Sequence, residues 1–321
     1  NHLTFMQGTA DADELREVAQ RAIDTFADEV DLADAWQQMA LAELLARNRA
    51  GQLAAMKRAQ QHAIASGDIR RQIAAWNELG GAMVFGRTPL SELEGFLDAE
   101  LAWARDHDVA AVEADALLAG PYVHARRGDF ELAREMLERS KAICRDLGIV
   151  YGLCEAGMAG SEMEVLAGDL AAAERELREV IDIAASIEAA HYVALYQVRL
   201  ARVLNDQGRH EEADALLDEA AGLSAGTPRW KSNRARVLAA RGELDEAVAL
   251  AHAAAALEAG SDDITAVAQT LVDISDVLIA AGDRAAAEAA LTEAIALNEA
   301  KGNIVSAQQC RERLAPLGPS G

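Results

Sequence analysis

Few side chains in this 321-residue sequence have the types and spacing that catalysis or metal binding requires. None of the four lysines ends the GxxxxGK motif of a phosphate-binding loop, and the seven histidines stand singly, without an HExxH zinc motif. Asp106, His107 and Asp108 resemble a metal patch, but they close a predicted helix and have no second pair of ligands. We interpret them as a solvated loop. The sequence predicts no catalytic residue, no metal site and no cofactor in this chain.

A glycine run at Gly152, Gly157 and Gly160 imitates a dinucleotide-binding fingerprint. No strand is predicted before it, and no helix start that could face a phosphate follows it. Small residues inside a helix commonly permit close packing of a neighbouring helix. We therefore interpret the run as a packing feature.

The charge of the chain excludes several classes of partner. Its 30 basic and 53 acidic residues give a net charge of −23, which is the wrong sign for nucleic acid or an anionic membrane surface. No apolar run reaches 18 residues, and the amino-terminal segment does not read as a signal peptide. Because the chain begins with Asn1, we expect a fragment of a longer protein. An odd number of cysteines without a CxxC pair predicts a cytoplasmic location; they are Cys144, Cys154 and Cys310.

The elements that would position any binding residue are predicted to be helices. Alanine accounts for 72 residues and aromatic residues for only 4%, a balance that favours helix and disfavours sheet. One motif recurs five times. It consists of a small or polar residue, a glycine and an acidic or polar residue, with an alanine five positions after the glycine. Its glycines are separated by 40, 40, 34 and 40 positions; they are Gly128, Gly168, Gly208, Gly242 and Gly282. The chain is therefore predicted to consist of internal repeats.

Each repeat is predicted to be a pair of antiparallel helices. The glycine supplies the positive φ at which the first helix ends, and an acidic residue after it favours the start of the second. Alanine five positions later lets the two helices approach closely. Leucine recurs four residues after that alanine on the same helical face, at Leu137, Leu177, Leu217 and Leu291, and Ala251 interrupts the series.

This unit resembles the tetratricopeptide (TPR) repeat, although most spacings are 40 residues rather than about 34. The Ala-rich motifs RGELDEAVALA and AGDRAAAEAALTEAIALNEAKGN, and the segment Leu291–Leu314, are similar to the carboxyl-terminal arrays of large bacterial regulators. In such proteins a nucleotide cyclase or a LuxR-type DNA-binding module is joined to an AAA (STAND) ATPase and then to a TPR-like superhelix. The resemblance implies cytoplasmic signalling, with the array as the sensor or partner-binding arm.

The fold prediction is all-α: a right-handed α-solenoid of about seven TPR-like helix pairs, each contacting only its neighbours, with an extra helix at each end. The whole chain, 1–321, is expected to form one array. Its predicted parts are an amino-terminal helix (1–30), divergent repeats (31–108), clear repeats (109–300), and a capping helix with a tail (301–321).

The first helices of the pairs would line the concave face, and the TPR resemblance implies which of their positions point inward. These positions lie 13, 10, 6 and 3 residues before each turn glycine. They predict a groove whose lining changes from apolar and aromatic through acidic to basic. The candidate binding residues are Trp76, Met83, Tyr122, Glu155, Met158, Arg202, Arg229 and Arg236. Arginine is suited to carboxylate or phosphate groups, and aromatic and methionine side chains give adaptable contact area.

His124 and Glu164 occupy equivalent positions in successive repeats. They could form a buried ion pair, or a local shift of register could place Val165 in the core and leave Glu164 in water. The chain as a whole is predicted to be a non-catalytic region that binds a protein, a peptide or the parent protein's own ATPase module. The alternative is a sensor that encloses a small-molecule effector. A closed pocket with converging polar groups would favour the small molecule, and a long open groove would favour a peptide or protein.

Overall fold

The computed structural model describes residues 11–46 and 48–317, and within them it contains sixteen α-helices, one short 3-10 helix and no strand. The helices of the amino-terminal half are α2 (Ala12–Thr25), α3 (Glu29–Leu45), α4 (Arg49–Ser66), α5 (Ile69–Phe85), α6 (Leu90–Asp106), α7 (Ala110–Arg127), α8 (Phe130–Leu147) and α9 (Val150–Ala167). The others are α10 (Leu170–Ser186), α11 (Ala190–Asp206), α12 (His210–Ser224), α13 (Pro228–Ala240), α14 (Leu244–Glu258), α15 (Ile264–Ala280), α16 (Arg284–Lys301), α17 (Ile304–Leu314) and η1 (Ala315–Leu317).

The glycine–acid motif forms the turn inside four of the helix pairs, α7–α8, α9–α10, α13–α14 and α15–α16, as the sequence predicts. Gly128 and Gly168 end α7 and α9 in the left-handed region, with φ of 96° and 82°. In the next position, the side chains of Asp129 and Asp169 accept hydrogen bonds from backbone N–H groups in the first turns of α8 and α10. The glycine thus stops one helix, and the aspartate starts the next.

The repeat alanine, five positions after the turn glycine, is buried where the paired helices meet. The five repeat alanines are fully covered; they are Ala133, Ala173, Ala213, Ala247 and Ala287. The recurring leucines next to them are buried in the same way, with Leu137 and Leu177 each no more than 2% exposed. Close approach at alanine and apolar contact at leucine therefore hold each pair together.

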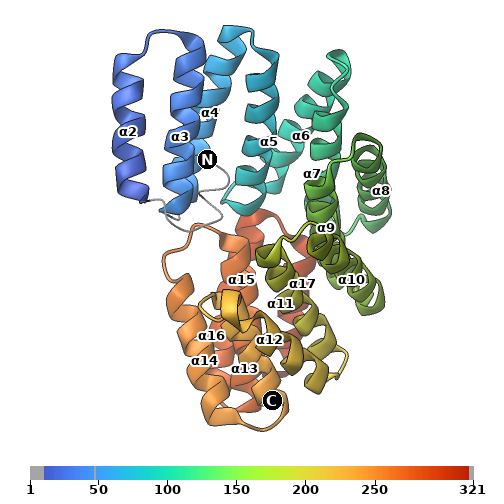
Figure 1. Cartoon of the computed structure of the whole chain (residues 1–321). Helices are drawn as coiled ribbons and strands as arrows, with labels where there is room; N and C mark the ends of the chain where they lie inside the picture. The colour runs from blue at the N-terminus through green and yellow to red at the C-terminus, as the bar shows by residue number, and fades with distance from the viewer. Residues whose placement is uncertain (1–10, 47, 318–321) are drawn as a thin grey trace.

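The pairs stack into a TPR-like superhelix, which confirms the predicted fold class (Figure 1). Helices α3 to α16 form seven pairs, with α2 before the first and α17 after the last. Among the residues that the structure describes, the buried apolar side chains form successive clusters along the array rather than one core. Each cluster is shared by adjacent pairs, as expected of a solenoid.

The array curls far enough for its last helices to touch its first half. Helix α17 packs on α7, and α15 contacts α5 (Figure 1). The ammonium of Lys301, at the end of α16, donates hydrogen bonds to the carbonyls of Met83 (2.8 Å) and Gly86 (2.6 Å) at the end of α5. Gln309 of α17 donates to the carbonyl of Leu166 in α9. The prediction that each pair contacts only its neighbours is therefore wrong: closure converts the expected open groove into a partly enclosed interior.

Candidate functional site

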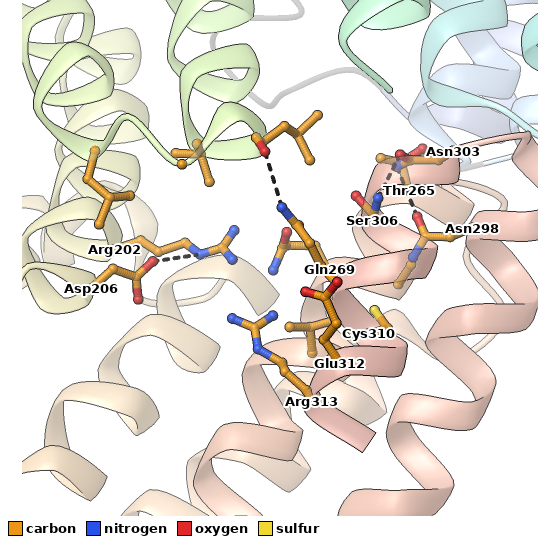
Figure 2. A pocket seen from close by; sticks show the side chains of 17 residues that line it. Arg202, Asp206, Thr265, Gln269, Asn298, Asn303, Ser306, Cys310, Glu312 and Arg313 are labelled. Atoms are coloured by element: carbon orange, nitrogen blue, oxygen red, sulfur yellow. Dashed lines mark hydrogen bonds and ion pairs between the residues drawn. The ribbon is translucent and has the colours of Figure 1, made fainter. Parts of the chain in front are cut away.

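The interior contains a cavity of about 590 Å³ between α9, α11, α15 and α17, which we call the C-terminal cavity. Figure 2 shows Arg202 and Asp206 of α11 on one side of it, facing Gln269 of α15 and Arg313 of α17 on the other. Gln309 of α17 and Leu166 of α9, which are joined by a hydrogen bond, both line this cavity. Because its walls come from the middle of the array (α9 and α11) and from its carboxyl-terminal end (α15 and α17), this cavity depends on the curling of the array.

A second cavity, of about 280 Å³, shares Arg202, Gln269 and several other residues with the first. We call it the arginine cavity. Five arginines and two acids line it, a surplus of three positive charges inside a chain whose net charge is −23. The charged residues are Arg49, Arg126, Arg199, Arg202, Arg229, Glu162 and Asp263. A local surplus opposite to the net charge attracts anionic groups to this part of the interior.

Arg126, near the end of α7, is the most deeply buried of these cations. Only 3% of the residue is exposed, and its Nη1 atom is buried without a hydrogen-bond partner among the described residues. The guanidinium carbon lies 5.2 Å from the ring centroid of Tyr122, one turn earlier, in a cation–π contact. A buried donor without a partner costs free energy, so this atom is suited to donate a hydrogen bond to an anionic ligand.

Glu162 of α9 partly neutralises the arginine cavity. It accepts a hydrogen bond from Arg199 of α11. Burial tends to raise the pKa of Glu162, but the charges of Arg199, Arg126 and Arg229 outweigh it and lower that pKa. The nearby charge of Arg199, together with burial, lowers the pKa of Arg229 to about 10. Three arginines thus converge on one carboxylate, which leaves positive charge for a ligand.

A third cavity, of about 440 Å³, lies between α5, α7 and α9, and we call it the acidic pocket. Its charged residues, within the described part of the chain, are the acids Glu78, Asp115 and Glu155. Burial, followed by the charge of Glu155, raises the pKa of Asp115 to about 7. Burial also raises the pKa of Glu155, against the opposing charge of Arg199. The buried hydroxyl of Tyr122 has no hydrogen-bond partner among the described residues and belongs to the same lining.

Four of the eight predicted binding residues line these cavities. Tyr122 and Glu155 lie in the acidic pocket, and Arg202 and Arg229 lie in the arginine cavity. Their role in binding stays a prediction. Arg126 and Arg199 were not predicted, because they fall two and nine residues before their turn glycines, outside the four offsets used. The pairing of Tyr122 with Arg126 at i and i+4 was the signal available for Arg126.

The other four predicted residues lie elsewhere in the structure. Met83 and Met158 are buried in apolar clusters, with exposures of 2% and 8%. Trp76 packs on the ring of Phe96 with centroids 5.1 Å apart. None of the three lines a cavity described above.

Arg236 also lines none of the three cavities. Its guanidinium bonds to Asp206 (2.6 Å) and Asp276 (3.1 Å) and lies near Asp273. This is a bridge between three helices, because the acids belong to α11 and α15. Its charge is therefore already matched within the protein.

The environment of Glu164 matches neither of the two alternatives that its sequence position left open. The side chain is buried, and it accepts hydrogen bonds from Nε (2.8 Å) and Nη2 (2.7 Å) of Arg134 in α8. Val165 lines the arginine cavity and the C-terminal cavity instead of filling the core. The partner of Glu164 is thus the arginine of the helix before it.

The glycines of α9 pack against neighbouring helices, which confirms the packing interpretation. A Cβ atom at Gly157 would lie 2.7 Å from Cβ of Val180, and one at Gly160 would lie 2.9 Å from Cδ2 of Leu137. Asp106 and His107 are exposed at the end of α6. Within residues 11–46 and 48–317, no group of three His, Cys, Asp or Glu side chains is placed to hold a metal ion. No helix of that part of the chain is long and apolar enough to cross a membrane.

Comparison with known families identifies TPR-like repeats in this chain. A model described as a tetratricopeptide repeat-like domain matches residues 146–275, and a tetratricopeptide repeat model matches residues 122–139. The comparison with curated proteins found no match.

Three solved structures illustrate the likeness of the fold. The Cut9–Hcn1 hetero-tetramer of the APC/C has a TM-score of 0.62 and 14% identity, and the match covers 96% of this chain and 55% of that one. A STAND protein of Pyrococcus horikoshii with a tetratricopeptide repeat sensor has a TM-score of 0.60 and 12% identity, covering 98% of this chain and 52% of that one. NprR in complex with its cognate peptide NprX has a TM-score of 0.58 and 14% identity, covering 89% and 81%. This chain therefore spans only about half the length of the first two proteins.

Proposed function

We propose that this chain is a non-catalytic binding region that holds a peptide segment of a partner inside its superhelix. The observation that carries the proposal is Arg126, a cation that is 3% exposed, lines the arginine cavity and has a buried Nη1 atom without a partner in the described residues. A buried guanidinium N–H group without a hydrogen-bond partner costs free energy. Binding of an anionic ligand would satisfy it.

The place of this region in a larger protein is part of the same proposal. The sequence resemblance to the arrays of bacterial cyclase and LuxR-type STAND regulators is supported by the likeness of fold to a STAND protein with a tetratricopeptide repeat sensor. In such an arrangement, in the cytoplasm, the array would report ligand binding to an ATPase module. The peptide could come from another protein or from that module itself. The peptide complex of NprR supports a peptide as the ligand class.

Selection from a random-sequence peptide display library tests the proposal. Peptides are selected on the native chain and then measured on two variants, Arg126→Met in the arginine cavity and Arg175→Gln at an exposed position of α10. We expect enriched peptides to lose at least tenfold in affinity on the first variant and to bind the second unchanged. Absence of enrichment, or equal binding to Arg126→Met, would contradict binding in the interior.

A small-molecule effector is the second candidate, and the closure of the array favours it. The C-terminal cavity, at about 590 Å³, lies within the range of about 300 to 1,000 Å³ typical of small-molecule sites. Polar groups from α11, α15 and α17 converge on it (Figure 2). If the peptide selection fails while a phosphate or organic anion raises the melting temperature of the native chain, but not of Arg313→Gln in the C-terminal cavity, this second candidate is supported.

A further inference from the structure

The acidic pocket and the arginine cavity adjoin one another. Phe85 lines both, and its ring meets that of Tyr122 edge-on, with centroids 5.6 Å apart. Tyr122 belongs to the acidic pocket, whereas Arg126, over the same ring, belongs to the arginine cavity. Two aromatic rings therefore separate compartments of opposite charge.

The change from acidic to basic side chains can be located on α7 by its own residues, and beside α9 by the arginine of α11 that pairs with one of its acids. On α7, Asp115 precedes Arg126 by eleven residues, which is about 16 Å along the helix at a rise of about 1.5 Å per residue. On α9, Glu155 precedes Glu162, the partner of Arg199, by seven residues, or about 10 Å. The interior thus changes from negative to positive over about 10 to 16 Å in one direction.

Both compartments hold groups that the protein itself leaves unmatched. In the acidic pocket, the charge of Glu155 adds to burial in raising the pKa of Asp115, and the buried Tyr122 hydroxyl lacks a partner in the described residues. In the arginine cavity, Arg199 and Arg229 repel one another, and Nη1 of Arg126 has no hydrogen-bond partner among the described residues. A ligand with one charge at each end would relieve both sides at once.

We propose that the interior selects a dipolar peptide, with a positively charged group in the acidic pocket against Asp115 and Glu155 and a carboxylate in the arginine cavity against Arg126 and Arg229. This inference rests on the proposed function and adds its specificity. A span of about 10 to 16 Å corresponds to about three to five residues of extended chain. A peptide with like charges at both ends places one of them in a compartment of its own sign, and that repulsion is the source of discrimination.

Isothermal titration calorimetry with three tetrapeptides tests the inference. All three have blocked termini and two central leucines; one carries lysine and aspartate at its ends, one carries two lysines and one carries two aspartates. We expect the dipolar peptide to bind the native chain at least tenfold more tightly than either like-charged peptide. Glu155→Gln removes charge from the acidic pocket, and Arg229→Gln removes charge from the arginine cavity.

Each variant is expected to weaken the dipolar peptide about tenfold, but to change the like-charged peptides differently. Glu155→Gln leaves the two-aspartate peptide no weaker, and Arg229→Gln leaves the two-lysine peptide no weaker. The matched controls Glu211→Gln and Arg175→Gln, at exposed positions of α12 and α10, leave all three affinities unchanged.

The possible failures separate the inference from the proposed function. Equal affinities for the three peptides, or a preference that survives both cavity variants, would overturn the dipolar inference while peptide binding stands. If no tetrapeptide binds but display selection succeeds, the selected sequences decide. A basic and an acidic residue three to five positions apart supports the inference, and random charge order overturns it. If selection also fails, the proposed function and the inference fall together.

Discussion

Replacing Glu100 by glutamine should stabilise the protein, and the gain should grow with pH. Glu100 lies on α6 with no exposed surface, and neither of its carboxyl oxygens has a hydrogen-bond partner among the described residues. Burial, followed by the charge of Asp115, raises the pKa of Glu100 to about 9. The folded protein therefore carries this carboxyl in its protonated form at neutral pH.

The size of the effect follows from proton binding in the two states. In the unfolded chain a glutamate ionises at a pKa of about 4.3, whereas the folded chain keeps the proton up to about pH 9. Between these values the folded state binds more protons, so stability falls as pH rises. At pH 7 the accumulated loss is about 3 to 4 kcal/mol at about 1.4 kcal/mol for each pH unit above 4.3. Glutamine cannot ionise and removes this loss.

Urea denaturation of both proteins between pH 4 and pH 9 measures the difference. We expect Glu100→Gln to match the native chain within about 1 kcal/mol near pH 4 and to exceed it by about 3 kcal/mol at pH 7. The control is Glu92→Gln on the same helix, whose side chain is 54% exposed and 3.4 Å from Lys57; a change under about 0.5 kcal/mol is expected. A difference for Glu100→Gln that is independent of pH would refute the reasoning.

Three further substitutions probe the cavity, the packing and the closure. Arg126→Met removes a buried N–H group without a partner together with the cation–π contact on Tyr122, so thermal denaturation should show a loss of no more than about 1 kcal/mol, and a loss of about 3 kcal/mol or more would show that the arginine is needed for stability. Gly157→Ala forces a methyl group towards Val180 and should lower the free energy of unfolding, measured by urea denaturation, by about 1 to 3 kcal/mol. The control Gly95→Ala, at a position with open space around it, should not destabilise the protein. Equal effects of the two substitutions would contradict the packing account. Lys301→Met removes both hydrogen bonds to the end of α5 and should increase the rate of amide hydrogen exchange in α17 and at the end of α5 together. Unchanged exchange would show that the closure does not depend on Lys301.

The helix pairs were predictable because their signals are local. A glycine with positive φ, an aspartate cap and a buried alanine act within ten residues of one another, so the motif at Gly128–Ala133 specifies its own turn wherever it recurs. The number of pairs and the extra terminal helices follow from counting such turns and the apolar periods between them.

The closure was not predictable in the same way, because it depends on the accumulated rotation between pairs. Lys301 and Met83 are separated by 218 positions, and no local pattern relates them. Met83 belongs to the core rather than to a groove, because it packs in an apolar cluster with residues of the surrounding amino-terminal helices. The offsets carried over from shorter repeats also missed Arg126 and Arg199, because these cavity-lining arginines lie two and nine residues before their turn glycines rather than at the four offsets used.

A crystal structure of the chain with a display-selected peptide tests the central claim most directly. We predict peptide density in the interior between α7, α9, α11 and α13, with a carboxylate within hydrogen-bond distance of Arg126. Peptide bound to the outer face formed by α8, α10 and α12, with the interior unchanged, would contradict the claim that the enclosed cavities are the binding site.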